Sequence, residues 1–502
     1  MNCKKLLSTR RAGVLCHITS LPGQQEFGDL GPTAYKFVDF IAACGFSIWQ
    51  VLPLGPTHPD LSPYNLLSTH AGNPQLISLD WLSKRGWLDE PTTAEFDANL
   101  GRCRDSYINS AYSYFKKYST PSEKSSFQYF IETHAYWLND FAYFTVLRKK
   151  FDNQVWNTWP DCFRDRQIEH LQNLNSDESA ELEYVKFQQF VFFTQWSELR
   201  DYATDKGVMI IGDMPIFVAY DSSDVWSHQD LFSLDQYKKP MTVTGVPPDY
   251  FSEYGQRWGN PQYNWEQHEA TDFVWWKGRV NIQSLLFDAL RIDHFRGLSQ
   301  YWAIPADEDT AVNGKWVNAP GENLLSALIK TFPDFCLIAE DLGTITDDVI
   351  ALRDKFHIPG MTVFQFAFDG SPDNPHLPNN YISHSIAYTA THDNDTTLSW
   401  YESLPDDARH YVNQFIELDD EIPWPMISSI FYSTADVAIL PMQDLLALGQ
   451  GNRMNVPGVK GGNWQWQFDW QQIDDNLRSK IAGLLIETNR INETVAILPA
   501  RS

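Results

Sequence analysis

The segment FDALRIDHF (287–295) is a short apolar run that ends in polar or charged residues. Seven further runs have the same form: GVLCHIT (13–19), SIWQVLP (47–53), GVMIIGDMP (207–215), DFCLIAEDLG (334–343), MTVFQF (361–366), SIAYTATHD (385–393) and DVAILPM (436–442). Such runs are typical of strands that are buried on both faces of a parallel sheet. Helical spacing precedes several of them, as at Leu324, Leu325 and Leu328. Eight buried strands that alternate with helices predict an α/β fold, the (β/α)8 TIM barrel.

Two intervals between these runs are too long for a simple strand–helix unit. The first contains Trp137, Phe141 and Phe144 at helical spacing and predicts a mostly helical insertion at 66–200, after the second strand. The second is rich in Trp, Tyr, Gly and Pro and predicts an irregular, aromatic-rich loop subdomain at 219–283, after the third strand. The tail after the eighth run is too short for a C-terminal β-sandwich domain. The length would allow about three domains of ~150 residues, but no linker marks a boundary. Residues 1–502 are therefore interpreted as one catalytic barrel.

Charge and composition exclude several classes of protein. The chain carries 38 Lys and Arg against 64 Asp and Glu, a formal net charge of −26, which opposes binding to nucleic acid and to anionic membrane surfaces. No apolar run is long enough for a transmembrane helix and no secretory signal follows the first residues, so a cytoplasmic protein is expected. The 19 Trp, 22 Tyr and 31 Phe, together with the negative charge, indicate a ligand that is not anionic.

The cysteines predict neither disulfides nor a metal site. They are scattered along the chain with no CxxC spacing, at 3, 16, 44, 103, 162 and 336. In a chain of this length and expected location, they are interpreted as buried reduced thiols.

Four of the predicted strands end in an acidic residue. Asp213, Asp293 and Glu340 close the third, fourth and fifth runs, and His392-Asp393 closes the seventh. A single acid at such a position is more often a helix cap than a functional group. The C-terminal ends of barrel strands meet at one mouth, however, where clustered carboxylates repel each other. Four acids at that mouth therefore indicate a function.

The surroundings of two of these acids predict different pKa values. A spacing of two places Arg291 and Asp293 on the same strand face, where the guanidinium is expected to keep Asp293 ionised. Glu340 ends an apolar run, so desolvation is expected to raise its pKa. One carboxyl group with a depressed pKa and one with a raised pKa, ~5–5.5 Å apart, is the pattern of a retaining glycosidase. Asp393, with His392 beside it, is then expected to hydrogen-bond the sugar as the oxocarbenium ion develops.

The segment GVPPDYFSEYGQRWGNPQYNW (245–265) has two possible interpretations. Its aromatic residues are Tyr250, Phe251, Tyr254, Trp258, Tyr263 and Trp265. Aromatic side chains most often form a hydrophobic core, but few aliphatic residues accompany these. A substrate-binding loop is therefore favoured, above all for Trp258, which stands between the polar Gln256-Arg257 pair and a Gly-Asn-Pro turn.

The chain resembles the amylomaltases, also called 4-α-glucanotransferases or disproportionating enzymes, of the α-amylase clan. The resemblance runs nearly end to end. It includes GVLCHITSLPG (13–23), WQVLPLGPT (49–57), SPYN (62–65), AGNP (71–74), GDMPIFVAYDSSDVW (212–226), the 245–265 segment, RIDHFRG (291–297), AEDLG (339–343), THDNDTT (391–397) and RMNVPG (453–458).

This resemblance implies a role for each matching residue. The nucleophile falls on Asp293, the general acid/base on Glu340 and the transition-state stabiliser on Asp393 rather than Asp395. The implied substrate-binding residues are Arg291, His392, Asp213, His294, Ser62, Tyr64, Gln256 and Trp258. The family implies no metal and no organic cofactor, and partners that are maltooligosaccharides and glucans derived from glycogen or starch.

Three other functions stay open at this stage. A retaining α-glucan hydrolase would use the same residues, and transfer in place of hydrolysis requires an acceptor site that outcompetes water. A Mg²⁺-dependent lyase or isomerase barrel would also place Asp213, Asp293 and Glu340 at strand ends, although Arg291 would compete with the metal. A glycan-binding protein without catalysis would not need all three acids.

Overall fold

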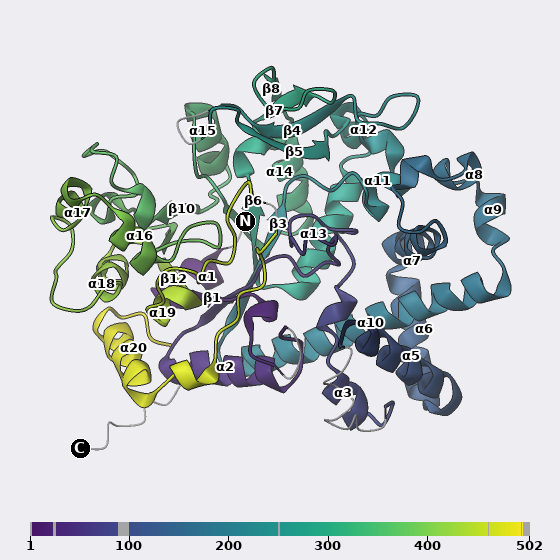
Figure 1. The fold of residues 1–502 in the computed structure, drawn as a ribbon, viewed down its shortest axis with the longest axis horizontal. Helices are drawn as coiled ribbons and strands as arrows, with labels where there is room; N and C mark the ends of the chain where they lie inside the picture. The colour runs from purple at the N-terminus through teal and green to yellow at the C-terminus, as the bar shows by residue number, and fades with distance from the viewer. Residues whose placement is uncertain are drawn as a thin grey trace.

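An eight-stranded parallel barrel lies at the centre of the molecule (Figure 1). The computed structural model describes residues 3–23, 27–88, 100–248, 252–459, 461–492 and 494. The barrel strands are β1 (Arg11–Leu15), β2 (Ile48–Gln50), β3 (Met209–Pro215), β6 (Ala289–Asp293), β9 (Cys336–Ala339), β10 (Gly360–Val363), β11 (Ser385–Tyr388) and β12 (Val437–Pro441). They neighbour each other in chain order, and the Ala339 N–H donates to the Pro359 carbonyl at 2.9 Å, which joins β9 to β10 and closes the ring. Each predicted apolar run overlaps one of these strands, so the predicted barrel is confirmed.

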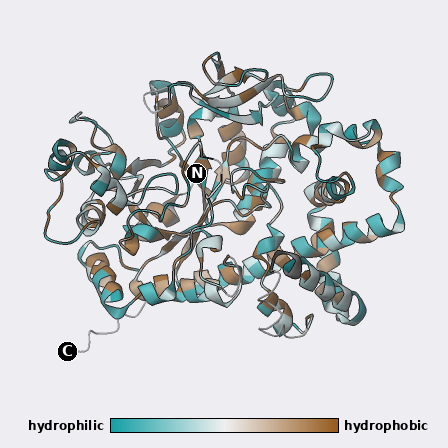
Figure 2. Ribbon diagram, in the orientation of Figure 1, coloured by the Kyte–Doolittle hydropathy of each residue, from teal (hydrophilic) through white to brown (hydrophobic). Residues whose placement is uncertain are grey.

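Helices cover the outside of the barrel. They include α2 (Pro32–Cys44), α10 (Ser176–Asp205), α13 (Val274–Leu286), α14 (Gly321–Thr331), α15 (Asp347–Lys355), α18 (Trp424–Tyr432) and α20 (Asp475–Glu487). Leu324, Leu325 and Leu328 are buried on α14, as their spacing predicts. One hydrophobic cluster fills the barrel interior and a larger one lies between the strands and the helices. Figure 2 shows brown strands in the middle and helices of mixed colour around them.

Between β2 and β3 the chain forms a mostly helical lobe, at the right of Figure 1. Its helices are α3 (Leu79–Lys84), α5 (Leu100–Tyr118), α6 (Pro121–Thr133), α7 (Ala135–Lys150), α8 (Asp161–Arg164), α9 (Ile168–Gln172) and the first part of α10. Capping boxes at Thr120 and Asn175 start α6 and α10. Trp137, Phe141 and Phe144 are buried on α7. The limits 66–200 for this insertion stay a prediction.

A four-stranded antiparallel sheet lies over the barrel, at the top of Figure 1, in the order β5-β4-β7-β8. The sequence predicts an irregular loop subdomain at 219–283, but this interval supplies β4 (Thr242–Val246) and β5 (Gln256–Pro261). The other two strands, β7 (Gln300–Pro305) and β8 (Lys315–Asn318), follow β6 and form a further excursion that was not predicted. Because β4 pairs with β7 across a whole barrel strand and its helix, the local pattern contains no sign of this pairing.

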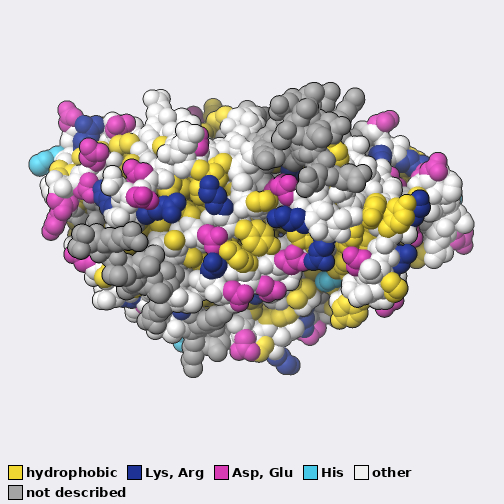
Figure 3. Space-filling view, turned by 90° about the horizontal axis from the view of Figure 1, so that it is seen from below, with side chains coloured by type: hydrophobic (Ala, Val, Ile, Leu, Met, Phe, Trp, Pro, Cys, Tyr) yellow, Lys and Arg dark blue, Asp and Glu magenta, His cyan; other side chains and the backbone are white. Residues whose placement is uncertain are grey.

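The remaining α-helices are short. They are α1 (Lys4–Leu7), α11 (Ser223–Ser227), α12 (Trp265–Ala270), α16 (Thr397–Ser403), α17 (Asp406–Val412) and α19 (Met442–Leu445). Among the described residues, no helix is both long and apolar enough to cross a membrane. On the face in Figure 3, basic and acidic side chains are interspersed rather than gathered by sign.

A disulfide joins the first helix to the barrel and corrects the cysteine prediction. Cys3 and Cys336 are bonded, with their Cα atoms 4.7 Å apart and a sequence separation of 333. Leu6 of α1 and Cys3 pack into the interior cluster of the barrel, so α1 brings Cys3 to the beginning of β9. Residue spacing could not predict this contact, because it depends on where α1 docks. Cys16, Cys44 and Cys162 are free.

We expect Cys3→Ser to lower the free energy of unfolding by about 2–4 kcal/mol, because the crosslink restricts the unfolded chain. The measurement is the apparent melting temperature by circular dichroism, with and without reductant. The reduced wild-type protein should have the same melting temperature as the variant. Cys162→Ser, which removes a free thiol, is the matched control. Equal melting temperatures for oxidised wild type and Cys3→Ser would contradict a stabilising role.

Candidate active site

The strand register brings the predicted acids to one end of the barrel. In the β3–β6 pair, Asp213 lies opposite Arg291. In the β6–β9 pair, Ile292 lies opposite Ala339, and the Glu340 N–H continues the ladder with a 3.0 Å bond to the Ile292 carbonyl. Asp293 and Glu340 therefore follow equivalent positions on adjacent strands. The parallel register of these short, buried strands places both residues at the same height in the barrel.

Arg291 connects two of the carboxylates. Its Nη1 lies 2.6 Å from Asp213 Oδ2, and its Nη2 lies 3.1 Å from Asp293 Oδ1. The Tyr64 hydroxyl donates to the same Asp213 oxygen at 2.7 Å. The side chain of Asp213 is 0% exposed, whereas that of Asp293 is 30% exposed. Asp213 thus anchors Arg291 and Tyr64 from beneath, while Asp293 is open to the mouth.

The pKa of Asp293 differs from the sequence-based prediction. Desolvation raises it to about 6, and the neighbouring Arg291 guanidinium only partly opposes this rise. The prediction of a depressed pKa considered Arg291 alone and is wrong, because burial of the carboxyl group raises the pKa by more than the guanidinium lowers it. Asp213 and Asp393 also repel a charge on Asp293. At neutral pH the carboxylate is still the main form.

Glu340 has surroundings that favour its protonated form. Desolvation raises its pKa to about 8, the direction expected from the apolar run before it. Its Oε2 accepts a hydrogen bond from the His294 N–H at 2.6 Å, and its Oε1 accepts one from the Leu342 N–H at 3.2 Å. These two backbone donors hold the carboxyl group beside Asp293.

Asp393 is the carboxylate with a depressed pKa. Desolvation alone would raise it, but contact with His392 Nε2, 3.3 Å from Oδ2, and the Asn455 amide lowers it to about 2. The Asn455 Nδ2 donates to Oδ1 at 2.6 Å, and Arg453 Nη2 donates to the Asp393 carbonyl at 2.7 Å. Asn455 and Arg453 lie in the RMNVPG segment, but their contacts were not predicted, since nothing local in the sequence connects them to Asp393.

Three aromatic rings lie together beside Asp213 and Asp393. The Tyr64 ring stacks on His392 with centroids 5.1 Å apart, and Trp464 lies 5.9 Å from both rings. Ser62 is half-buried next to Tyr64, and its Oγ accepts the Tyr64 N–H at 3.3 Å. Ser62, Tyr64 and His392 therefore lie in one region, at the side of Asp213 and Asp393.

The 245–265 segment divides between the two interpretations. Tyr263 is buried among other aromatic rings, so it belongs to a hydrophobic core. Trp258 is 39% exposed, donates from Nε1 to Gln256 Oε1 at 3.1 Å, and meets the His294 ring edge to face with centroids 4.8 Å apart. Trp258 and Gln256 are thus placed next to the mouth. Tyr250 and Phe251 lie outside the described residues.

The acids are not arranged as a metal site. No group of three or more His, Cys, Asp and Glu side chains in the described part of the chain has the geometry of a metal-ion site. The Arg291 guanidinium occupies the position between Asp213 and Asp293 where a shared cation would have to lie.

Comparisons with known proteins give a consistent result. The sequence profile of a glycoside hydrolase family described as 4-α-glucanotransferase matches residues 16–472. The chain is 42% identical to a 4-α-glucanotransferase of Thermus thermophilus over 96% of this chain and 99% of that protein. It is 40% identical to a plastid 4-α-glucanotransferase of Solanum tuberosum, over 93% of this chain and 84% of that protein. The structure of a Streptococcus agalactiae amylomaltase in complex with acarbose matches with TM-score 0.92 and 35% identity, over 96% of this chain and 100% of that one.

Proposed function

Because the chain belongs to glycoside hydrolase family 77, the 4-α-glucanotransferases of the α-amylase clan, we propose that it works by retaining double displacement. It moves a segment of an α-1,4-glucan to the 4-hydroxyl of an acceptor glucose or maltodextrin through a covalent glucosyl–Asp293 intermediate. The observation that carries this mechanism is the set of carboxyl groups around Arg291, whose pKa values are about 6 at Asp293, 8 at Glu340 and 2 at Asp393. At neutral pH this set provides a nucleophile, an acid and a fixed negative charge.

In the first step, Asp293 attacks the anomeric carbon of the donor. The bond from that carbon to the glycosidic oxygen breaks, and Glu340 gives its proton to the departing oxygen. Arg291 keeps the attacking carboxylate in position from below. The Asp393 carboxylate stabilises the positive charge that develops on the sugar ring.

In the second step, the acceptor replaces the released fragment. Glu340, now ionised, takes the proton from the acceptor 4-hydroxyl, whose oxygen attacks the anomeric carbon and displaces Asp293. Trp258 contributes an apolar face on the acceptor side, while Ser62, Tyr64, Gln256 and His392 bind the donor. Asp213 acts through Arg291 and Tyr64, since its own side chain is covered.

The partners follow from the same chemistry. We propose that maltooligosaccharides and glucans derived from glycogen or starch bind at the mouth, in the cytoplasm, without a metal or an organic cofactor. Support comes from the net charge of −26 and from the S. agalactiae relative, whose complex contains acarbose.

Incubation with maltotriose tests the proposal. Transfer yields glucose together with a ladder of longer maltodextrins, whereas the second candidate, a retaining hydrolase with the same residues, yields only shorter sugars.

Chelation with EDTA is expected to leave the product pattern unchanged. A chelator-sensitive activity restored by Mg²⁺ would refute the mechanism.

Trp258→Ala is expected to lower the ratio of transfer to hydrolysis about three- to tenfold, because the acceptor loses an aromatic face while water does not. The ratio is measured as longer maltodextrins formed per reducing end released. Trp316→Ala is the matched control, since Trp316 is also 39% exposed and lies on β8 of the same sheet. An unchanged ratio in Trp258→Ala would remove Trp258 from the acceptor site.

A further inference from the structure

A short loop after β2 carries two of the residues that are proposed to bind the donor, Ser62 and Tyr64. We call residues 57–66 the donor loop. An antiparallel bridge between its first and last residues closes its base. The Tyr64 hydroxyl donates to Asp213 at 2.7 Å, so the loop extends to the carboxylates at the mouth of the barrel.

One carboxylate holds the tip of this loop. Asp60 Oδ1 accepts the Ser62 N–H at 3.1 Å, and Asp60 Oδ2 accepts a hydrogen bond from Asn65 Nδ2 at 2.8 Å. Leu61 has φ 62°, in the left-handed region, which is unusual for a bulky side chain. Leu61 is also 39% exposed, so burial does not compensate for this conformation. Both hydrogen bonds of Asp60 span Leu61 and therefore stabilise the turn that Leu61 itself disfavours.

The position of Ser62 depends on this tip. Its N–H is held by Asp60, and its Oγ accepts the Tyr64 N–H at 3.3 Å. A hydroxyl group that accepts this bond can still donate its hydrogen to a sugar. Tyr64 has a separate anchor in Asp213, so a change at Asp60 should displace Ser62 more than Tyr64.

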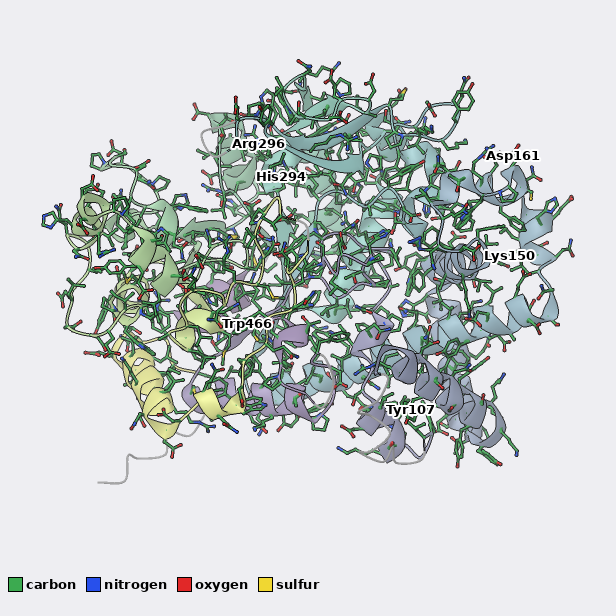
Figure 4. The ribbon with its side chains drawn as sticks, in the orientation of Figure 1. Tyr107, Lys150, Asp161, His294, Arg296 and Trp466 are labelled. Carbon is green, nitrogen blue, oxygen red and sulfur yellow. A yellow bond between two sulfur atoms is a disulfide. The ribbon has the colours of Figure 1, made fainter. Side chains whose placement is uncertain are left out.

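We infer that Asp60 and Asn65 are positioning residues for the donor, because the bond between them sets the tip of the loop and with it the place of Ser62. The inference rests on the proposed role of Ser62 in donor binding. The proposed acceptor face is elsewhere: Trp258 lies against His294, which Figure 4 shows below the antiparallel sheet. Changes in the donor loop should therefore alter the affinity for the donor and leave the ratio of transfer to hydrolysis unchanged.

Exchanging the two side chains tests the bond itself. Asn65→Asp places a second carboxylate opposite Asp60 and replaces the hydrogen bond by repulsion between like charges. Asp60→Asn alone should be almost neutral, because its amide oxygen can accept the Ser62 N–H while its NH₂ group donates to the side-chain oxygen of Asn65. The double variant with Asp60→Asn and Asn65→Asp again has a donor opposite an acceptor, with the two residue types exchanged.

The loop between β7 and β8 provides a matched control. There Asn313 Nδ2 donates to Glu308 Oε1 at 3.1 Å, and this pair, like Asp60 and Asn65, is exposed and five residues apart in sequence. Asn313→Asp therefore makes the same change of charge and breaks the same kind of bond, at a place that has no proposed contact with the donor.

Binding of maltoheptaose is measured by isothermal titration calorimetry, with Asp293→Asn present in every protein so that the sugar is not turned over. We expect Asn65→Asp to weaken binding about three- to tenfold, because a hydrogen bond is lost and a like charge faces Asp60. The double variant, Asp60→Asn and Asn313→Asp should each bind within about twofold of the starting protein. In proteins that keep Asp293, Asn65→Asp should raise KM for maltoheptaose and leave kcat nearly unchanged.

The inference would be overturned by unchanged binding in Asn65→Asp, by a double variant that binds as weakly as Asn65→Asp, or by an equal loss in Asn313→Asp. A melting temperature that is lower in Asn65→Asp than in Asn313→Asp would assign the bond to stability instead. The binding test needs no turnover. Failure of maltotriose transfer would therefore count against the proposed function, whereas unchanged maltoheptaose binding in Asn65→Asp would count against this inference alone.

Discussion

Replacing Asp293 by asparagine is expected to reduce glucan transfer by a factor on the order of 10⁴ or more, as loss of a covalent nucleophile does in other enzymes. The substitution keeps the shape of the side chain, so the fold should be retained. An amide oxygen still accepts a hydrogen bond from Arg291, but it cannot form the glucosyl ester. The loss should therefore appear in kcat, while donor binding is largely kept.

The comparison with Asp395→Asn makes this test specific. Asp395 belongs to the same THDND segment, but its carboxylate accepts hydrogen bonds from the Thr396 N–H and the Ser399 hydroxyl at the start of α16. Loss of that carboxylate should affect stability more than catalysis. The protein is incubated with maltotriose, and the reaction is then quenched. Mass spectrometry should detect a covalent adduct on the wild-type protein and none on Asp293→Asn. Full activity of Asp293→Asn would show that the nucleophile lies elsewhere.

The fold was predictable because the barrel strands are short and buried on both faces. Each therefore appears in the sequence as an uninterrupted apolar run, such as MIIGDMP in β3 or VAILP in β12. The antiparallel sheet was not predictable in this way. Its strand β4 is half polar, and its partner β7 lies beyond another barrel strand, so the pairing is decided by tertiary structure. The Cys3–Cys336 bond has the same origin.

The candidate site was predictable where one residue type at the end of a strand suggests the chemistry. Asp293, Glu340 and Asp393 were assigned from position, and the structure brings them to one mouth. The sequence could not show that Arg291 bonds to both Asp213 and Asp293. Nor could it show that burial of Asp293 raises the pKa of its carboxyl group in spite of the guanidinium. Nor could it provide the support of Asp393 by Asn455, which comes from the loop after a different strand.

Glu340→Gln is expected to lower the rate on maltotriose by about 10²–10⁴-fold, because the departing sugar oxygen is no longer protonated. The loss depends on the leaving group. With α-maltosyl fluoride, whose fluoride leaves without a proton, formation of the Asp293 intermediate should recover in Glu340→Gln but not in Asp293→Asn. Glu322→Gln, which removes an exposed carboxylate paired with Lys355, is the matched control.

The pH profile gives this prediction a second measurement. In the proposed mechanism Asp293 attacks as the carboxylate, so kcat/KM of the wild type should fall as the pH drops through about 6, where Asp293 takes up a proton. Glu340 must start protonated, so kcat/KM should also fall as the pH rises through about 8. In Glu340→Gln the basic limb should disappear because the proposed acid is gone, and the acidic limb should remain because Asp293 still titrates. A basic limb that persists in Glu340→Gln would assign the acid to another group.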